Sequence, residues 1–310
     1  MSTQISLGAS PITSLLHDDS ARNRLVGIGL ISAAVLMFSV LDTSAKWLVA
    51  SLPLVQIVWM RFVGHVLVSA VVLGPRHGLG LVRTRRPGLQ AVRALLLPAM
   101  TAMNFWALKY LQLAETGSIM FLAPILVALI GSLWLNERLD RGRWGAILIG
   151  FAGVLVILQP GTRGFHPAML VSLLQAVMYA VFMVLTRTLA ATDRPAATQF
   201  LSALASALLL TPLALAAWVT PETPLQWVVV CLTGLSGGLG HQLLAMSHRY
   251  APASTVTPFI YQQILYMTLL GYLVFGDVPG LAVVAGGAIV VGSGLYLLVR
   301  ERRGPGAGSA

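Results

Sequence analysis

The sequence predicts an all-α polytopic membrane protein with about ten transmembrane helices in two inverted five-helix repeats. Of its 310 residues, 57% are hydrophobic and only 10% are charged, and the mean hydropathy is +0.83. An ordinary soluble domain is about one quarter charged, so a water-soluble fold could not bury this much apolar sequence. The apolar residues also fall into stretches of roughly 20 residues, which is the length that a helix needs to cross a bilayer.

Ten such stretches follow one another along the chain. They cover 25–49, 53–73, 92–111, 114–135, 143–159, 167–189, 196–218, 225–247, 252–275 and 280–299. Prolines cluster in the gaps, as expected for residues that start or stop helices. The gaps are too short for a soluble domain. The first stretch is longer than a signal-peptide core and lacks a convincing cleavage site, so we expect it to be retained as a helix.

Basic residues are distributed unevenly between the two ends of the predicted helices. If the N-terminus is cytoplasmic, the outside segments hold only Lys46, Lys109 and Arg163. The inside segments then hold Arg22, Arg24, Arg76, Arg83, Arg85, Arg86, Arg93, Arg138, Arg141, Arg143, Arg187, Arg194, Arg249, Arg300, Arg302 and Arg303. The positive-inside rule therefore predicts a bacterial inner-membrane protein with both termini in the cytoplasm. The net charge of +10 reflects this topology, and nucleic acid is not an expected partner.

The two halves of the sequence repeat each other. Tyr110 and Tyr250 are separated by 140 positions, and so are the acidic residues Glu137 and Asp277. Further matches in nearly the same register are Leu129/Leu269, Gly131/Gly271, Leu133/Leu273, Phe38/Tyr179 and Lys46/Arg187. Each half contains five helices, so the second must enter the membrane in the opposite orientation, which is typical of secondary transporters. We expect a tail over 1–24, repeats over 25–159 and 167–299, and a second tail over 300–310.

Two long segments carry a family resemblance. Residues 107–139, ALKYLQLAETGSIMFLAPILVALIGSLWLNERL, followed by RGRWGAILIGFAGVLVIL, resemble the EamA-type branch of the drug/metabolite transporter superfamily. The second half carries the related SHRYAPASTVTPFIYQQILYMTLLGYLVFGD. The resemblance covers roughly residues 25 to 300 and implies two inverted five-helix repeats around a central cavity. It also implies transport, since such proteins export amino acids and metal-chelating metabolites or import riboflavin or S-adenosylmethionine. The chain departs from the pattern at Asn136, where Gly is common, and at Ile264, which corresponds to Pro124.

Charged side chains inside the predicted spans form a first candidate site. A charge there costs on the order of several kcal/mol, so each one is a candidate for function. Asp42 and Arg61 are each about 12 Å from the outer end of their helices, at 1.5 Å per residue. Lys46 lies one turn from Asp42, and His65 one turn from Arg61. This predicts a polar column that is either a structural ion pair or a site that handles substrate or protons. Glu115, Glu137, Asp140 and Asp277, at segment ends, are expected to be solvated boundary residues.

Aromatic and amide side chains form a second candidate site near the bilayer midplane. Phe38 and Tyr179 are repeat-related, and so are Phe121 and Tyr261, and all four are about 14 to 20 Å from a helix end. The amides nearby are Gln175, Gln262, Gln263 and, on the third helix, Asn104. Inverted-repeat transporters bind substrate at this depth. Packing between helices is the alternative role for these side chains. His241 follows the glycine-rich stretch 233–240, and is either a hydrogen-bonded packing residue or a proton relay.

Other classes of protein are less well supported. The string Gly234-Leu235-Ser236-Gly237 matches the GxSG motif of rhomboid-type intramembrane proteases, but no histidine follows His248 to serve as a base from a later helix. No HExxH, P-loop or dinucleotide motif is present, so ATP-driven transport is not supported. Cys231 is the only cysteine, so neither a disulfide framework nor a cysteine-based metal site is available, and we expect neither an enzyme nor a cofactor. We expect a secondary transporter that exports an amino-acid-like, aromatic or metal-chelating metabolite. Import of riboflavin, S-adenosylmethionine or a similar metabolite is the alternative, and a channel or scramblase is the alternative of another class. The sequence leaves coupling to protons or another ion, and the oligomeric state, open.

Overall fold

The computed structural model describes residues 21–134, 141–162 and 164–303. Every regular element in these ranges is a helix, and ten helical segments there are long and apolar enough to cross a membrane. Both findings confirm the predicted all-α polytopic fold. The residues Asn136, Glu137, Asp140 and Arg163 lie outside the described ranges.

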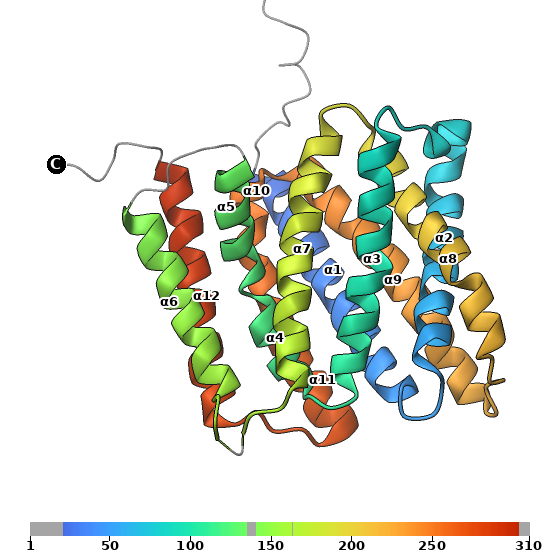
Figure 1. The fold of residues 1–310 in the computed structure, drawn as a ribbon. Coiled ribbons are helices and arrows are strands. Elements are labelled where there is room, and N and C mark those ends of the chain that lie inside the picture. The colour runs from blue at the N-terminus through green and yellow to red at the C-terminus, as the bar shows by residue number, and fades with distance from the viewer. Residues whose placement is uncertain (1–20, 135–140, 163, 304–310) are drawn as a thin grey trace, which may run out of the picture.

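The first half of the chain forms five spans (Figure 1). They are α1 (Ala21–Leu48), α2 (Leu54–His77), α3 (Pro87–Leu108), the broken span α4 (Leu113–Met120) and α5 (Ala123–Trp134), and α6 (Arg141–Leu158). A short 3-10 helix, η2 (Gly78–Val82), follows α2.

The second half forms the other five spans. They are α7 (Ala168–Ala190), α8 (Pro195–Ala216), α9 (Pro224–Tyr250), the broken span η3 (Thr257–Gln262) and α11 (Gln263–Phe275), and α12 (Leu281–Arg303). The single turn α10 (Ala253–Val256) connects α9 to η3.

Prolines and capping side chains set where several helices begin. Pro87, Pro195 and Pro224 occupy the first turn of α3, α8 and α9, where the missing backbone N–H of proline has no helical partner to lose. Glu115 caps α4, because its Oε2 accepts a hydrogen bond from the backbone N–H of Gln112 at 2.7 Å. These residues therefore act at helix boundaries, as their positions in the sequence predict.

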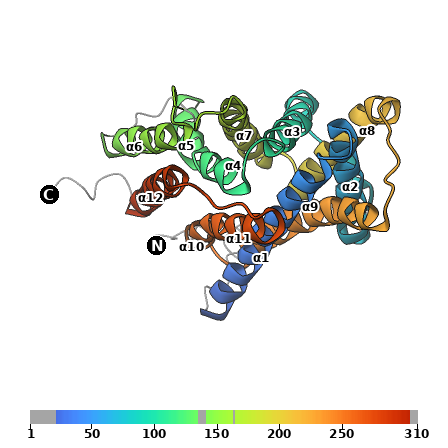
Figure 2. The ribbon, with the colours of Figure 1, turned by 90° about the horizontal axis from the view of Figure 1, so that it is seen from below.

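The two halves are arranged as inverted repeats. Their first helices, α1 and α7, run in opposite directions (Figure 1). Helix contacts repeat as well: α1 packs along α9 as α7 packs along α3, and α2 packs on α9 as α8 packs on α3. The broken spans correspond too, since the repeat-related Phe121 and Tyr261 both lie at the break. Seen from below, α6 and α12 form one end of the bundle and α2 and α8 the other (Figure 2).

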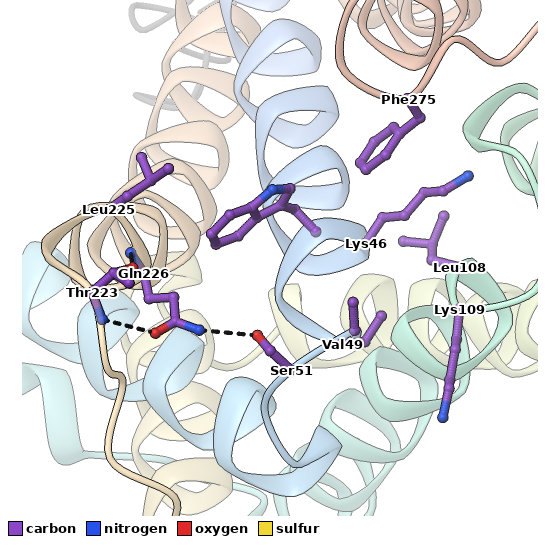
Figure 3. A pocket seen from close by; sticks show the side chains of 11 residues that line it. Lys46, Val49, Ser51, Leu108, Lys109, Thr223, Leu225, Gln226 and Phe275 are labelled. Carbon is purple, nitrogen blue, oxygen red and sulfur yellow. Dashed lines mark hydrogen bonds between the residues drawn. The ribbon is translucent and has the colours of Figure 1, made fainter.

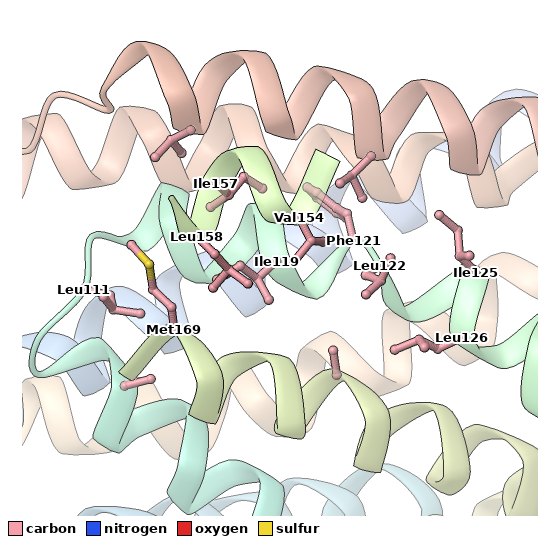
Figure 4. Packing of buried hydrophobic residues seen from close by; sticks show 14 of the residues in the cluster. Leu111, Ile119, Phe121, Leu122, Ile125, Leu126, Val154, Ile157, Leu158 and Met169 are labelled. Carbon is pink, nitrogen blue, oxygen red and sulfur yellow. The ribbon is translucent and has the colours of Figure 1, made fainter. Parts of the chain in front are cut away.

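The apolar core consists of two large clusters of buried side chains. One lies between α4, α5, α6, α7 and α12 and includes Phe121 and Val154 (Figure 4). The other lies mainly between α1, α2, α3 and α8 and includes Phe62 and Phe105. Large apolar side chains also cover the outside of the bundle, and Leu148, for example, is 65% exposed. Such a surface fits a hydrocarbon environment.

Glycines bring pairs of helices into backbone contact. A Cβ atom at Gly234 of α9 would lie 2.7 Å from the Cα atom of Gly64 of α2. A Cβ atom at Gly153 of α6 would lie 2.9 Å from the carbonyl oxygen of Gly286 of α12. Neither position can carry a side chain unless the helices move apart. The glycine-rich stretch 233–240 thus permits the close helix approach that the sequence predicts.

Candidate functional site

Asp42 of α1 and Arg61 of α2 are buried in the bundle, 8% and 4% exposed. Asp42 Oδ1 accepts a hydrogen bond from Asn104 Nδ2 at 2.8 Å, which ties α1 to α3. Among the described residues, no salt bridge joins Asp42 to Arg61, although their charges interact through space. The direct ion pair considered as one role for these residues is therefore not formed in this structure.

Arg61 instead lies between an aromatic ring and a glycine. Its Cζ is 4.3 Å from the centroid of the Phe62 ring, and a Cβ atom at Gly237 would lie 3.5 Å from its Nε. The side chain thus occupies space against α9 that only a small residue leaves free. Arg61 Nε and Nη1 are buried and have no hydrogen-bond partner.

Two histidines and a phenylalanine meet next to this arginine. The rings of His65 and His241 are stacked, with centroids 5.1 Å apart, and Phe38 meets His241 edge-on at 5.0 Å. Gln199 Nε2 lies 3.3 Å from His65 Nε2. A Cβ atom at Gly240 would lie 2.7 Å from the Phe38 ring, so glycine at this position makes room for Phe38. Residues from α1, α2, α8 and α9 therefore meet in one polar and aromatic group.

Arg93 is a buried residue of this region that the sequence analysis placed in a cytoplasmic segment. In the structure α3 begins at Pro87, so Arg93 lies inside the helix, and its side chain is only 6% exposed. Its Nε donates to Thr186 Oγ1 at 2.8 Å, and its Nη1 donates to the carbonyl oxygen of Thr198 at 3.0 Å. Its Cζ also lies 4.1 Å from the centroid of the Phe182 ring.

A sequence signal for Arg93 did exist. Gln90 precedes it by one turn and bonds to the same Thr198 carbonyl at 2.9 Å. On α8, Thr198, Ser202 and Ser206 recur every four residues, which places three hydroxyls on one helix face. Two polar helix faces of this kind indicate a polar contact between spans rather than a solvated loop.

Tyr179 of α7 lies beside Arg93. Its ring stacks on Phe182 with centroids 6.3 Å apart, and its hydroxyl is within electrostatic range of the Arg93 charge. Tyr179, Gln175 and Phe38 are all partly exposed, in contrast to the buried arginines. The first candidate site and part of the second are thus neighbours in the structure.

Phe121 and Tyr261 lie elsewhere. Their rings contact each other, with centroids 5.1 Å apart, inside the apolar cluster of α4 to α7 and α12. Figure 4 shows Phe121 in this cluster. The Tyr261 hydroxyl has no hydrogen-bond partner and lies against Gly294 of α12. Gln262 and Gln263 are half-buried at the η3–α11 junction. Phe121 and Tyr261 thus belong to one apolar cluster, whereas Phe38 and Tyr179 pack against the other.

The sequence predicts that Lys46 continues the polar column from Asp42, but in the structure Lys46 has other partners. Its Nζ lies 2.6 Å from Asp277 Oδ2 and donates to the carbonyl oxygen of Leu111 at 3.0 Å. Asp277, expected to be a solvated boundary residue, is therefore an ion-pair partner. The left-handed Gly276 (φ 70°) ends α11, and the Asp277 N–H returns to the Gly271 carbonyl at 3.1 Å, which fixes the carboxylate near α1.

Pockets lie at both ends of the bundle. One, of 660 Å³, is lined by the last turns of α1, α3 and α11 and the start of α9, and includes Lys46, Lys109 and Phe275 (Figure 3). The other, of 400 Å³, lies at the opposite end between α2 and α9 and includes Arg76 and Gln242. Along α2, Arg61 and His65 precede the residues that line the second pocket, and on α9 His241 is adjacent to Gln242, which lines the same pocket.

Sequence comparison then assigns the chain to a family. The model of the EamA-like transporter family matches residues 25–159 and again residues 166–300. The chain belongs to the EamA-like transporter family. The two matches cover nearly the whole described bundle, so this EamA-like protein is a multi-pass bacterial membrane protein, and the family is one of small-molecule transporters.

Curated relatives of this EamA-like chain differ in substrate and direction. The S-adenosylmethionine uptake transporter of Rickettsia bellii (strain RML369-C) is 25% identical over 291 residues, which cover 92% of this chain and 98% of that protein. The riboflavin transporter of Vibrio cholerae serotype O1 is 32% identical over 74% of this chain and 77% of that protein. The pseudopaline exporter CntI of Pseudomonas aeruginosa is 29% identical over 86% and 93%.

A solved structure described as "Crystal structure of protein" shares the fold. The TM-score is 0.64 with 22% sequence identity, and the match covers 93% of this chain and 99% of that one. At this identity the likeness supports the EamA-like fold alone.

Proposed function

We propose that this protein is a secondary carrier that moves a small organic solute across the inner membrane by alternating access. The solute is held by a central group of side chains, which we call the central site. Its members are Phe38, Asp42, Arg61, His65, Asn104, Tyr179 and His241. Both termini are cytoplasmic in this proposal, as the arginine distribution predicts.

The observation that carries the proposal is that the buried polar side chains of the first repeat meet a half-buried histidine of the second. His65 of the first repeat stacks on His241 of the second, and Arg61 lies against Gly237 of the second. Buried ionisable groups are costly within a bilayer and are therefore expected to face a partner, a cavity or a bound solute. In inverted-repeat carriers the substrate binds between the repeats near the midplane, and rocking of one repeat against the other exposes it to each side in turn.

The depth of the site agrees with this mechanism. Arg61 is seven residues from the start of α2, and Tyr179 is eleven residues from the start of α7. At 1.5 Å per residue these positions lie about 10 and 16 Å inside the bundle. A solute at the central site would be reachable from either end only after the helices around it move.

Export of an amino-acid-like, aromatic or metal-chelating metabolite is the direction that the sequence favours. Uptake of S-adenosylmethionine, riboflavin or a similar metabolite is the second candidate, favoured by relatives that align over most of this chain. The gradients of the solute and of any coupled ion, rather than the geometry of the binding site, set the direction of net transport by a carrier. One assay therefore tests both export and uptake.

Counterflow in proteoliposomes tests the carrier function. Metabolites that change in cells with and without the protein are identified first, and one is then labelled. We expect unlabelled solute inside the vesicles to accelerate uptake of labelled solute, because a carrier returns more quickly when loaded. Flux that is insensitive to solute on the far side would indicate a channel or scramblase and would overturn the proposal.

A further inference from the structure

Arg61 is a buried cation without a partner for two of its three nitrogens. The side chain is only 4% exposed, and Nε and Nη1 have no hydrogen-bond acceptor. A guanidinium that loses its water without gaining acceptors is strongly disfavoured. A structural arginine would normally be satisfied by the protein itself, as Arg93 is by Thr186 and Thr198.

The groups around Arg61 do not supply the missing acceptors. Asp42 is held toward α3 by Asn104 and is beyond salt-bridge distance. Phe62 covers the guanidinium with its ring, and Gly237 offers no side chain. The nearest histidines, His65 and His241, stack on each other instead.

The charge of the region points to an anionic ligand. Arg61 and Arg93 are two cations, and both act electrostatically on His65 and His241. Asp42 is the one carboxylate that the structure shows within range of Arg61, and the partners of Arg93 are neutral hydroxyl and carbonyl groups. With neutral histidines and an ionised Asp42, the described residues of the central site, together with Arg93, therefore carry one unbalanced positive charge.

We propose that the transported solute carries a carboxylate that binds Arg61, a proposal that rests on the carrier function proposed above. The planar guanidinium presents paired N–H donors that match the two oxygens of a carboxylate. One carboxylate also balances the single positive charge that remains when Asp42 is ionised, whereas a phosphate dianion would exceed that charge. Phe38 and Tyr179, which are aromatic and partly exposed, contact the apolar part of the same solute.

Matched acid and amide probes test the carboxylate contact. The unfolding temperature of the purified full-length protein in detergent is measured with each member of three pairs that differ in a carboxylate, all at equal ionic strength. The pairs are S-adenosylmethionine and its decarboxylated form, tryptophan and tryptophanamide, and benzoate and benzamide. We expect at least one acid to raise the unfolding temperature while its partner does not. Inorganic phosphate, tested alone, is expected to have a smaller effect than that acid.

Three variants connect the effect to Arg61. R61Q removes the charge and should weaken binding of the acid by about tenfold or more, since charge-assisted contacts are lost. R61K keeps the charge and is the control for a folding defect in R61Q. It should bind the acid more weakly than wild type but still prefer it to its uncharged partner. R187Q, which changes an exposed arginine on α7, should bind like wild type.

Several outcomes would overturn the proposal. They are the absence of acid preference in every pair with wild type, equal stabilisation by phosphate, and an acid preference that survives unchanged in R61Q. The carrier function would stand even so if counterflow proceeds with a neutral solute. Conversely, acid binding at Arg61 without solute exchange would remove the carrier function and leave the binding site.

Discussion

Lys46 Nζ of α1 lies 2.6 Å from Asp277 Oδ2, and this contact joins the first repeat to the loop after α11 of the second. Lys46 also holds the Leu111 carbonyl between α3 and α4, and lies 4.8 Å from the centroid of the Phe275 ring. The contact therefore ties together the ends of α1, α3 and α11 beside the pocket of Figure 3. It is placed where movement of one repeat against the other would break it.

Neutralising either partner of this ion pair should lower the unfolding temperature slightly and change the transport rate more. The pair is partly exposed, 15% for Lys46 and 22% for Asp277, so we expect a stability effect of about 0.2–1 kcal/mol. K46M and D277N are compared with the charge-reversed K46D/D277K in melts and in counterflow. Recovery of the transport rate in the reversed variant would show that the ion pair itself acts in the movement of the two repeats. Equal losses of rate in all three variants would argue against this role.

Close packing of α2 and α9 should not tolerate a methyl group at Gly64. The backbones of Gly64 and Gly234 touch, so G64A forces the helices apart and should destabilise the protein by about 1–3 kcal/mol. Gly74 lies on the same helix, and a Cβ atom there meets nothing within 4 Å. G74A is therefore the matched control, and thermal melts of both variants measure the difference. If G64A melts like G74A, backbone contact does not hold these helices together.

Asp193, in the turn between α7 and α8, should contribute to stability in a pH-dependent way. Burial raises the pKa of its carboxyl, but hydrogen bonds from the Thr84 hydroxyl and the Arg85 backbone N–H, together with smaller contributions, lower the pKa by more than burial raises it. The net pKa therefore falls below its usual 3.8. A lowered folded-state pKa stabilises the protein above the unfolded value, and this contribution is lost as pH falls through the folded value.

The variant D193N should accordingly melt at a lower temperature than wild type at neutral pH. The difference should shrink as the pH falls below about 3.8, the unfolded value. E222Q, which neutralises an exposed carboxyl before α9, serves as the control and should show little difference at any pH. If D193N melts below wild type by the same amount at neutral pH and below pH 3.8, the shape of the Asp193 side chain, not its charge, is responsible.

The spans were predictable from sequence because their determinants are local. Length and hydropathy set the number of helices, and prolines such as Pro195 and Pro224 mark where they start. The placement of Asp42 and Arg61 at a common depth followed from helix rise alone. Their partners did not, because Asn104 and Gly237 belong to α3 and α9, and contacts between helices depend on how those helices pack.

Arg93 and Tyr261 both show that the sequence does not predict which neighbours a side chain has on other helices. From sequence, Arg93 counts among the basic residues of the cytoplasmic segments, because a charge at the edge of an apolar stretch resembles a topology signal. Its burial depends on polar groups of α7 and α8, which local sequence does not reveal. Tyr261 has the depth of a midplane ligand contact, but the lateral position of η3 places it against Phe121 in the apolar cluster. Depth follows from sequence spacing, whereas lateral position follows from packing.

The contrast between Tyr179 and Tyr261 gives the most direct test of where the solute binds. Tyr179 is partly exposed beside Arg93, whereas Tyr261 is 7% exposed and packed on Phe121. An aromatic contact to a solute contributes about 0.5–1.5 kcal/mol, so Y179A should weaken the apparent affinity roughly 2- to 12-fold and leave the protein folded in the membrane. Y261A instead removes a buried ring and should destabilise the fold by about 3–5 kcal/mol, as for other buried aromatic residues. Counterflow of an identified solute, in variants matched for membrane abundance and compared with melts, separates the two effects. If Y179A transports with unchanged affinity and rate while changes at Asp42 or Arg61 abolish binding, the solute binds at those charged residues without contacting Tyr179, and Tyr179 does not belong to the central site.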